Sequence, residues 1–144
     1  MKTITVCPSC KKLNKVDVSS AKSSQPTCGH CQANLSIRGS YSELSASELQ
    51  ALIKETKKPI VVDFWAPWCG PCKSFAPHFQ NVSDQLAEDF IFVKVNTEEH
   101  PLAGDLFKIR GIPTIAKFQN GIEKNRISGA MPSEQFKQWV SAEN

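Results

Sequence analysis

The 144-residue chain has no long apolar run. None of its hydrophobic stretches approaches the ~18 residues that a membrane-spanning helix needs. The first ten residues, MKTITVCPSC, have neither the apolar core nor the cleavage site of a secretory signal. The nine prolines and seven glycines are spread along the chain and form no low-complexity tract. We therefore expect a cytoplasmic protein with no membrane partner.

The first forty residues lack aromatic side chains, and they hold few apolar residues from which a core could be built. They carry one of the 14 acidic side chains but six of the 17 basic ones. About 36 residues cannot normally bury enough apolar surface to fold unaided. The missing aromatic rings also argue against a nucleic-acid partner, because single strands bind by stacking on such rings. We predict a small basic module over residues 1–40 and a larger domain over 41–144.

From residue 41 onward, helical and extended patterns alternate. Ser45 and Glu48 have the spacing of a capping box, and an amphipathic helix over 46–57 follows them. Asn120-Gly121 is a strong signal for a two-residue β-hairpin turn. The other expected elements are a short strand near residue 41, strands over 60–65, 90–95, 114–118 and 122–128, and helices over 71–88, 101–108 and 133–142. This order predicts an α/β fold, in which helices cover both faces of a mixed sheet.

Two cysteines, Cys69 and Cys72, stand where the strand over 60–65 ends and the helix over 71–88 begins. The dipole and the free N–H groups of a helix N-terminus stabilise a thiolate on the first cysteine, which makes it a nucleophile near neutral pH. The second cysteine lies about one turn further on, within reach of a disulfide. We expect Cys69 to be the exposed attacking thiol and Cys72 the resolving thiol, with a mixed disulfide to substrate between the two steps. A structural disulfide and half of a metal site are the alternatives.

The segment DFWAPWCGPCK, residues 63–73, resembles the active-site segment of the thioredoxin family, and the resemblance extends over residues 41–144. It implies a thioredoxin fold and a protein-disulfide reductase without an organic cofactor. The implied partners are disulfide-bearing substrate proteins and an NADPH-dependent thioredoxin reductase. Gly70 and Pro71 resemble the dipeptide of reducing members, whereas oxidising and isomerising relatives usually carry a His there.

The same resemblance assigns a substrate surface. Gly111–Thr114 is similar to the loop in which Pro113 is cis and faces the active site, leaving the backbone of Ile112 free to pair with an extended substrate. An ordinary turn is the alternative for Pro113. Gly129 matches the glycine beside the substrate groove. Trp68 is expected to line the substrate face with Gly70 and Pro71, and Trp65 to pack in the core beneath the site.

Two charged residues lie inside apolar strand segments. Asp63 ends such a run, so its carboxyl should be buried, which raises a carboxyl pKa into the range of a general base near neutrality. The family resemblance makes Asp63 the proton acceptor for Cys72 and Lys94 the residue that tunes Asp63. In the alternative interpretations, Asp63 is a polar residue at a strand end whose hydrogen bonds are satisfied, and Lys94 is a strand residue that faces solvent.

Four more cysteines, Cys7, Cys10, Cys28 and Cys31, have the spacing C-x2-C-x17-C-x2-C. This range is typical of a zinc site, and four thiolates form the closed shell of structural zinc. One bound Zn²⁺ would also supply the folding energy that the module lacks. Iron, two disulfides, or His30 in place of one cysteine are the alternatives. Zinc knuckles commonly have Gly after the second cysteine, whereas Lys11 and Gln32 occupy those positions.

Together, the module and the larger domain resemble the zinc-bearing bacterial members of the thioredoxin family. Two further interpretations are kept. The module could be a nucleic-acid or protein-binding unit on a thioredoxin scaffold, which loss or survival of function in Cys69→Ser would decide. It could also sense oxidants by releasing its metal. The reduction potential separates a reductase, near the value of about −270 mV known for thioredoxin, from an isomerase at about −180 mV.

Overall fold

The computed structural model describes residues 2–17, 25–35 and 42–142 of the chain. The predicted boundary between the two units, at residues 40 and 41, lies outside the described residues. None of the helices within the described ranges is long and apolar enough to span a bilayer.

The larger unit is built on a five-stranded mixed sheet with the strand order β3-β5-β4-β6-β7. β4 lies at its centre, parallel to β5 and antiparallel to β6. The bounds are Ser42–Glu43 for β3, Ile60–Trp65 for β4, Ile91–Asn96 for β5, Thr114–Gln119 for β6 and Ile122–Ser128 for β7. A continuous apolar run such as IVVDFW is what a strand covered on both faces requires, and the α/β prediction is confirmed.

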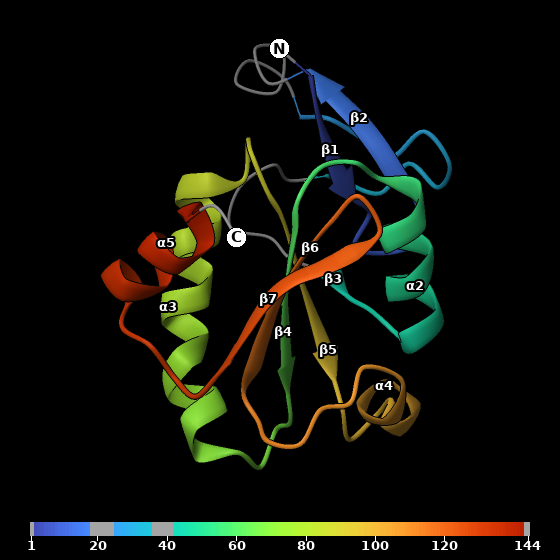
Figure 1. Cartoon of the computed structure of the whole chain (residues 1–144). Coiled ribbons are helices and arrows are strands. Elements are labelled where there is room, and N and C mark those ends of the chain that lie inside the picture. Colours follow the sequence, from blue (N-terminus) through green and yellow to red (C-terminus); the bar gives the residue numbers. More distant parts are fainter. Residues whose placement is uncertain (1, 18–24, 36–41, 143–144) are drawn as a thin grey trace.

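Helices cover both faces of this sheet, with α3 and α5 on one side and α2 and α4 on the other (Figure 1). The bounds are Ala46–Glu55 for α2, Gly70–Leu86 for α3, Pro101–Leu106 for α4 and Ser133–Ser141 for α5. The capping box at Ser45 is confirmed, because its hydroxyl accepts from the N–H of Glu48 and its own N–H donates to the Glu48 carboxylate. α4 is two residues shorter than predicted, since Phe107 caps it and Lys108 takes a left-handed φ of 54°.

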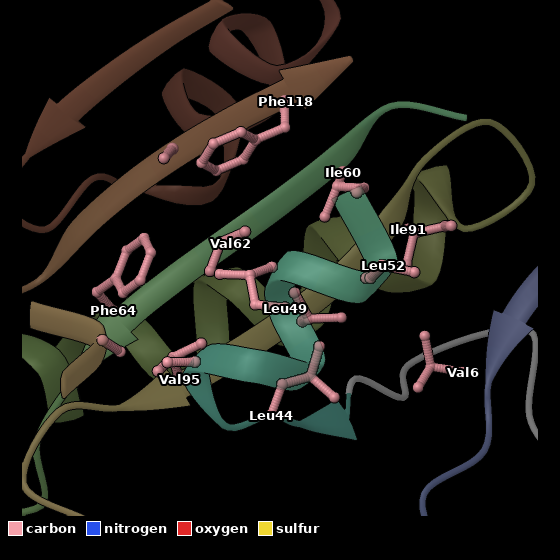
Figure 2. Close-up of a cluster of buried hydrophobic side chains, with 14 residues drawn as sticks. Val6, Leu44, Leu49, Leu52, Ile60, Val62, Phe64, Ile91, Val95 and Phe118 are labelled. Carbon is pink, nitrogen blue, oxygen red and sulfur yellow. The ribbon is translucent and has the colours of Figure 1, made fainter. Parts of the chain in front are cut away.

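Alternate residues of β4 enter two separate apolar clusters. Val62 and Phe64 pack with Leu49 and Leu52 of α2, and Figure 2 shows these side chains between that helix and the sheet. Val61 faces the other way. It packs in a cluster of aromatic rings from α3, β5 and α5: Phe75, Phe79, Phe92 and Phe136. Asp63 is therefore on the α3 side of the sheet, as the period of two along a strand requires.

The N-terminal segment forms an antiparallel hairpin of β1 (Lys2–Val6) and β2 (Leu13–Asp17), which the sequence did not lead us to predict. This hairpin lies beside α2 (Figure 1). Val6 is 7% exposed and belongs to the same apolar cluster as Leu52, and Leu13 packs against that cluster. Figure 2 shows Val6 at the edge of the cluster. The module therefore contributes side chains to the core of the larger unit.

Side chains from other elements hold both ends of α5. At its beginning, Nδ1 of His78 accepts the backbone N–H of Ser133 at 3.1 Å. At its end, the buried Nζ of Lys117 on β6 donates to the carbonyl oxygens of Trp139, Val140 and Ala142 at 2.8–3.1 Å. Burial lowers the pKa of Lys117. The last carbonyls of a helix lack partners within the helix, and Lys117 supplies them here.

Candidate active site and candidate metal centre

Cys69 and Cys72 lie at the start of α3, directly after the carboxyl end of β4. Cys69 is the N-cap of the helix, and its extended backbone (φ −83°, ψ 114°) ends the preceding turn. Its sulfur accepts the N–H of Cys72 at 3.2 Å, and the two sulfurs form a disulfide. A cap position places sulfur where the unsatisfied N–H groups and the positive end of the helix dipole converge. This environment stabilises the thiolate that forms when the disulfide is reduced.

The predicted exposure of Cys69 is wrong for this disulfide form. Its residue exposure is 5%, against 2% for Cys72, so both cysteines are buried and Cys69 is only slightly the more open. The sulfur of Cys69 is bonded to that of Cys72 and lies near the carbonyl oxygen of Ile112. Trp68 is by contrast strongly exposed at this turn, with 67% of its surface accessible to solvent. Gly70 and Pro71, in the first turn of α3, are also exposed.

The loop before β6 lies directly against the disulfide. The Ile112–Pro113 peptide bond is cis, as the family resemblance implied, so the ordinary-turn alternative is wrong. The carbonyl oxygen of Ile112 is 3.7 Å from Sγ of Cys69. Gly129 joins the same region, because its N–H donates to the carbonyl of Pro113 at 2.9 Å. Its φ of 101° is one that glycine adopts without strain.

Asp63 is fully buried on the α3 face of β4, and neither of its carboxylate oxygens has a hydrogen-bond partner among the described residues. A buried carboxylate without hydrogen bonds is costly, so the neutral form is favoured. Burial raises the pKa of Asp63 to about 7, and Lys94 opposes that rise. The alternative of a satisfied polar group at a strand end is thus wrong.

Lys94 is 5% exposed, so it is not the solvated strand residue of the alternative. Its Nζ lies 3.9 Å from Oδ2 of Asp63 and 4.5 Å above the ring of Trp65. Trp65 is half-buried and belongs to neither apolar cluster, which differs from the core position we predicted. Its indole N–H instead donates to Oε2 of Glu43 at 3.3 Å. Glu43 was not predicted from the sequence, because its place in the site depends on the pairing of β3 with β5.

The four N-terminal cysteines form one compact cluster, and none of them is disulfide-bonded. Their sulfurs all lie within 4.8 Å of one another. Two cross pairs, Cys7 with Cys31 and Cys10 with Cys28, are each 3.6 Å apart. Four sulfurs at the corners of a tetrahedron, about 2.3 Å from a shared metal, would be ~3.8 Å apart. The cluster is thus of the right size for one metal ion. His30 is exposed and is not a member of it.

The two C-x-x-C segments of the cluster have the same backbone shape. In the first, the N–H of Lys11 donates to the carbonyl of Cys7, and in the second the N–H of Gln32 donates to the carbonyl of Cys28. Lys11 and Gln32 have φ values of 67° and 64°, in the left-handed region that favours glycine. The two departures from the common pattern therefore leave the knuckle geometry intact.

Hydrogen bonds favour the thiolate state of Cys28, whereas burial and the neighbouring sulfurs raise the pKa of Cys10 to about 12. The N–H groups of Cys31 and His30 lower the pKa of Cys28 to about 6. The side-chain amide of Asn14 on β2 donates to the same sulfur at 3.4 Å, and its Oδ1 accepts the N–H of Gly29 at 3.0 Å. Asn14 thereby ties the β1–β2 hairpin to the second knuckle. It was not predicted, because no local pattern marks a contact between residues so far apart.

Comparisons with known proteins agree with this geometry. The thioredoxin family model matches residues 40–142. Thioredoxin C-3 of Corynebacterium nephridii is 37% identical over 138 residues, 95% of this chain and 92% of its own. That match includes most of the first forty residues. Thioredoxin of Mycoplasma genitalium is 48% identical over 80 residues, covering 56% of this chain and 78% of its own. The crystal structure of Fasciola hepatica thioredoxin superposes with a TM-score of 0.63 at 32% identity, over 67% of this chain and 92% of its own.

The fold and the disulfide at the start of α3 thus define a thiol–disulfide oxidoreductase. The chain belongs to the thioredoxin family, and its N-terminal four-cysteine cluster is compatible with the zinc-containing type.

Proposed function

We propose that the chain reduces protein disulfides with Cys69 as nucleophile and Cys72 as resolving thiol. The Cys69 thiolate attacks a substrate sulfur, forms a mixed disulfide and releases one substrate thiolate. Cys72 then gives up its proton and attacks Sγ of Cys69, which releases the second substrate thiolate and leaves the Cys69–Cys72 disulfide. The substrate gains the two electrons that the dithiol loses. The N-cap position of Cys69, with the Cys72 N–H on its sulfur, is the observation that supports these roles.

Asp63 is proposed as the acceptor of the Cys72 proton. A carboxyl with a pKa of about 7 exists in both forms at neutral pH, so it can take a proton and later return it. Lys94 limits the rise in the pKa of Asp63 through its charge 3.9 Å away. Without Lys94, the carboxyl would stay protonated to higher pH and would be a weaker acceptor near neutrality.

The substrate is proposed to bind across the loops that meet at Cys69. The surface consists of Trp68, Gly70, Pro71, Ile112, Pro113 and Gly129. An extended segment on either side of the substrate cysteine would pair with the backbone of Ile112, while Trp68 supplies exposed apolar area. This arrangement suits disulfides in exposed, extended chain segments.

An NADPH-dependent thioredoxin reductase is the proposed source of electrons. The Cys69–Cys72 dithiol holds only two electrons, so it has to be reduced again after each turnover. The test is a coupled assay, in which NADPH oxidation and insulin precipitation are followed with the full chain and a thioredoxin reductase. Turnover that disappears in Cys69→Ser supports the proposal. Turnover that survives in Cys69→Ser would mean that another part of the chain carries the activity.

The four N-terminal cysteines are proposed to bind one structural Zn²⁺ through their four thiolates. Their spacing within the tetrahedral range and the N–H groups directed at Cys28 support this ligand set. Ferrous iron satisfies the same four thiolates, so the test is elemental analysis after expression with both metals supplied. Close to one zinc per chain is the expected result.

We also propose residues 1–40 as the metal module and 41–144 as the thioredoxin domain.

A cytoplasmic location is proposed from the state of the cysteines, since four thiols held ready for a metal suit a reducing compartment. Cell fractionation tests this location.

A second role for the module, oxidant sensing, is favoured by the two cross pairs of sulfurs at 3.6 Å. A peroxide could oxidise each pair to a disulfide with little movement, releasing the metal and being reduced to water. Zinc release that follows peroxide dose, measured with a chelating dye, tests this role.

A further inference from the structure

Three charged residues form a row across the strands β3, β5 and β4, which are neighbours in the sheet. The register pairs Glu43 with Lys94 and Lys94 with Asp63. Residues paired in adjacent strands present their side chains to the same face of the sheet. That face is the one covered by α3, at whose first turn the Cys69–Cys72 pair lies (Figure 1). Lys94, on the middle strand, therefore lies between Glu43 and Asp63 in the row.

The position of Glu43 is fixed by Trp65. The indole N–H of Trp65 donates to the Glu43 carboxylate at 3.3 Å, and the ring of the same residue lies 4.5 Å below Nζ of Lys94. Glu43 is half-buried, and burial raises its pKa. Besides Lys94, the charges that act on Glu43 are Glu99 after β5 and Lys11 in the first knuckle. The charges that act on Asp63 are Lys94 and Glu43.

We propose that Glu43 is a positioning residue for the active-site acid: its carboxylate shares the Lys94 ammonium with Asp63 and so limits how far that ammonium neutralises Asp63. The inference rests on the proposed function in that Asp63 is taken as the proton acceptor. One cation cannot fully compensate two anions in a site of low dielectric. Glu43 thus keeps Asp63 in the range where it exchanges protons near neutral pH.

The two effects of Glu43 on Asp63 have the same sign. Its negative charge disfavours ionisation of Asp63 directly, which raises the pKa of Asp63. Its attraction for Lys94 also weakens the opposing pull of that ammonium. Replacing Glu43 with a neutral residue should therefore lower the pKa of Asp63, with burial still holding it above that of an exposed carboxyl.

The experiment is a titration of Asp63 in the Glu43→Gln variant of the full, metal-loaded chain. The carboxyl carbon of labelled aspartate is followed by NMR in the disulfide form, where Cys69 and Cys72 do not titrate. Gln keeps an oxygen for the Trp65 N–H, so the indole proton signal should stay in place. We expect the Asp63 midpoint to fall by about one pH unit, the low end of what one nearby charge does. An unchanged or higher midpoint overturns the proposal.

Matched variants separate charge sharing from other causes. Glu99→Gln removes the same charge from an exposed side chain, and it should leave the Asp63 midpoint unchanged. Glu43→Asp keeps the charge and should retain most of the parent midpoint. In a Lys94→Gln background, Glu43→Gln should shift the midpoint less, because there is no longer an ammonium to share. An equal shift in that background would overturn the sharing of Lys94.

Activity measurements test the proposed role of Asp63 separately. If Asp63 accepts the Cys72 proton, the acid limb of disulfide reduction should move to lower pH in Glu43→Gln. If the Asp63 midpoint falls but the acid limb does not move, Asp63 is not the acceptor of the Cys72 proton. The effect of Glu43 on Asp63 would still hold. If the Asp63 midpoint does not move, Glu43 has no effect on Asp63, and the proposed role of Asp63 as proton acceptor is untouched.

Discussion

The chain uses the spacing C-x-x-C three times and folds it in two ways. In both N-terminal knuckles the residue after the second cysteine, Lys11 or Gln32, has a positive φ. At the active site the corresponding residue is Lys73, whose N–H donates to the carbonyl of Cys69 as α3 continues. The backbone after the second cysteine thus differs, although the spacing is the same.

This difference determines what each sulfur faces. In a knuckle the chain turns back, so each sulfur faces one from the other knuckle and four of them meet. At the start of α3 the chain proceeds into a helix, so the sulfur of Cys69 meets its own partner, the N–H of Cys72 and the carbonyl of Ile112, and no other thiol pair among the described residues. The first arrangement suits a closed metal site, and the second suits a thiolate that attacks other molecules.

Loss of the metal should have the largest effect of any change to the chain. We expect Cys28→Ser to remove the zinc and unfold the module, because metal binding in small zinc domains supplies about 10–16 kcal/mol. Disulfide reduction should survive, since the sheet and its helices remain. Metal content and the NMR spectrum measure the two outcomes. His30→Ala, a change within the same knuckle, is the control and should keep its metal. Melting of residues 42–142 together with the module would show that the two regions are not separable.

Changes at the active site should instead impair disulfide reduction and leave the metal in place. Cys69→Ser should lower disulfide reduction by roughly a thousandfold or more, because it removes the nucleophile, while metal content stays at one per chain. Cys72→Ser should instead accumulate mixed disulfides with substrate proteins, which non-reducing gels detect. Equal trapping by both variants would contradict the assignment of attacker and resolver.

Asp63→Asn should stabilise the protein while impairing it. The pKa of Asp63 is about 7 in the folded state, against roughly 4 for an unfolded chain. Between these values the unfolded chain has released a proton that the folded chain keeps, so the stability of the parent falls as pH rises. The gain in Asp63→Asn should be near zero below pH 4 and should reach about 2–4 kcal/mol above pH 7. Urea denaturation at several pH values measures it.

The exposed Asp84→Asn is the control for this change and should show no such trend. Turnover of Asp63→Asn should be lowest at acid and neutral pH. It should recover as pH rises, because Cys72 then ionises unaided. A loss of turnover that does not depend on pH would make Asp63 a structural residue only.

The smallest expected effect tests the backbone difference itself. Lys11→Gly and Gln32→Gly should each stabilise the metal-bound module by up to about 1 kcal/mol, because glycine takes a positive φ without strain. Lys73→Gly should act in the opposite sense and cost about 1 kcal/mol, since it places glycine inside a helix. Thermal unfolding of the three variants compares them. Destabilisation by Gly at both knuckle positions would contradict the role assigned to the positive φ.

The features predicted from sequence are those that depend on neighbouring residues. The capping box at Ser45, the Asn120-Gly121 turn and the Cys69–Cys72 pair are complete within a few positions. The turn has φ values of 56° and 79°, as a two-residue hairpin requires. Glu43, Asn14 and the insertion of Val6 into the core were missed. Each acts through a contact between segments far apart in the chain, which no local pattern encodes.

The errors have the same origin. Cys69 was predicted to be the exposed thiol from its place at the start of a helix. In the disulfide form it is buried, and the carbonyl oxygen of Ile112, 43 positions away, lies 3.7 Å from its sulfur. Trp65 was predicted to pack in the core beneath the site, but Lys94 and Glu43 on two other strands give it polar contacts. The doubt that Lys11 and Gln32 raised about the knuckles is a different, local case, because the backbone holds both residues at positive φ.

Lys117 has a consequence for how this protein opens. Its ammonium is buried on β6 and serves three carbonyl oxygens at the end of α5. Fraying of the last turn would leave that ammonium in the interior without acceptors, so α5 cannot loosen from its end at little cost. The C-terminal helix is the place where a small domain would ordinarily begin to unravel. Here its amide hydrogens should exchange with solvent at rates close to those of the central strands, so that detachment of α5 coincides with unfolding of the sheet that it covers.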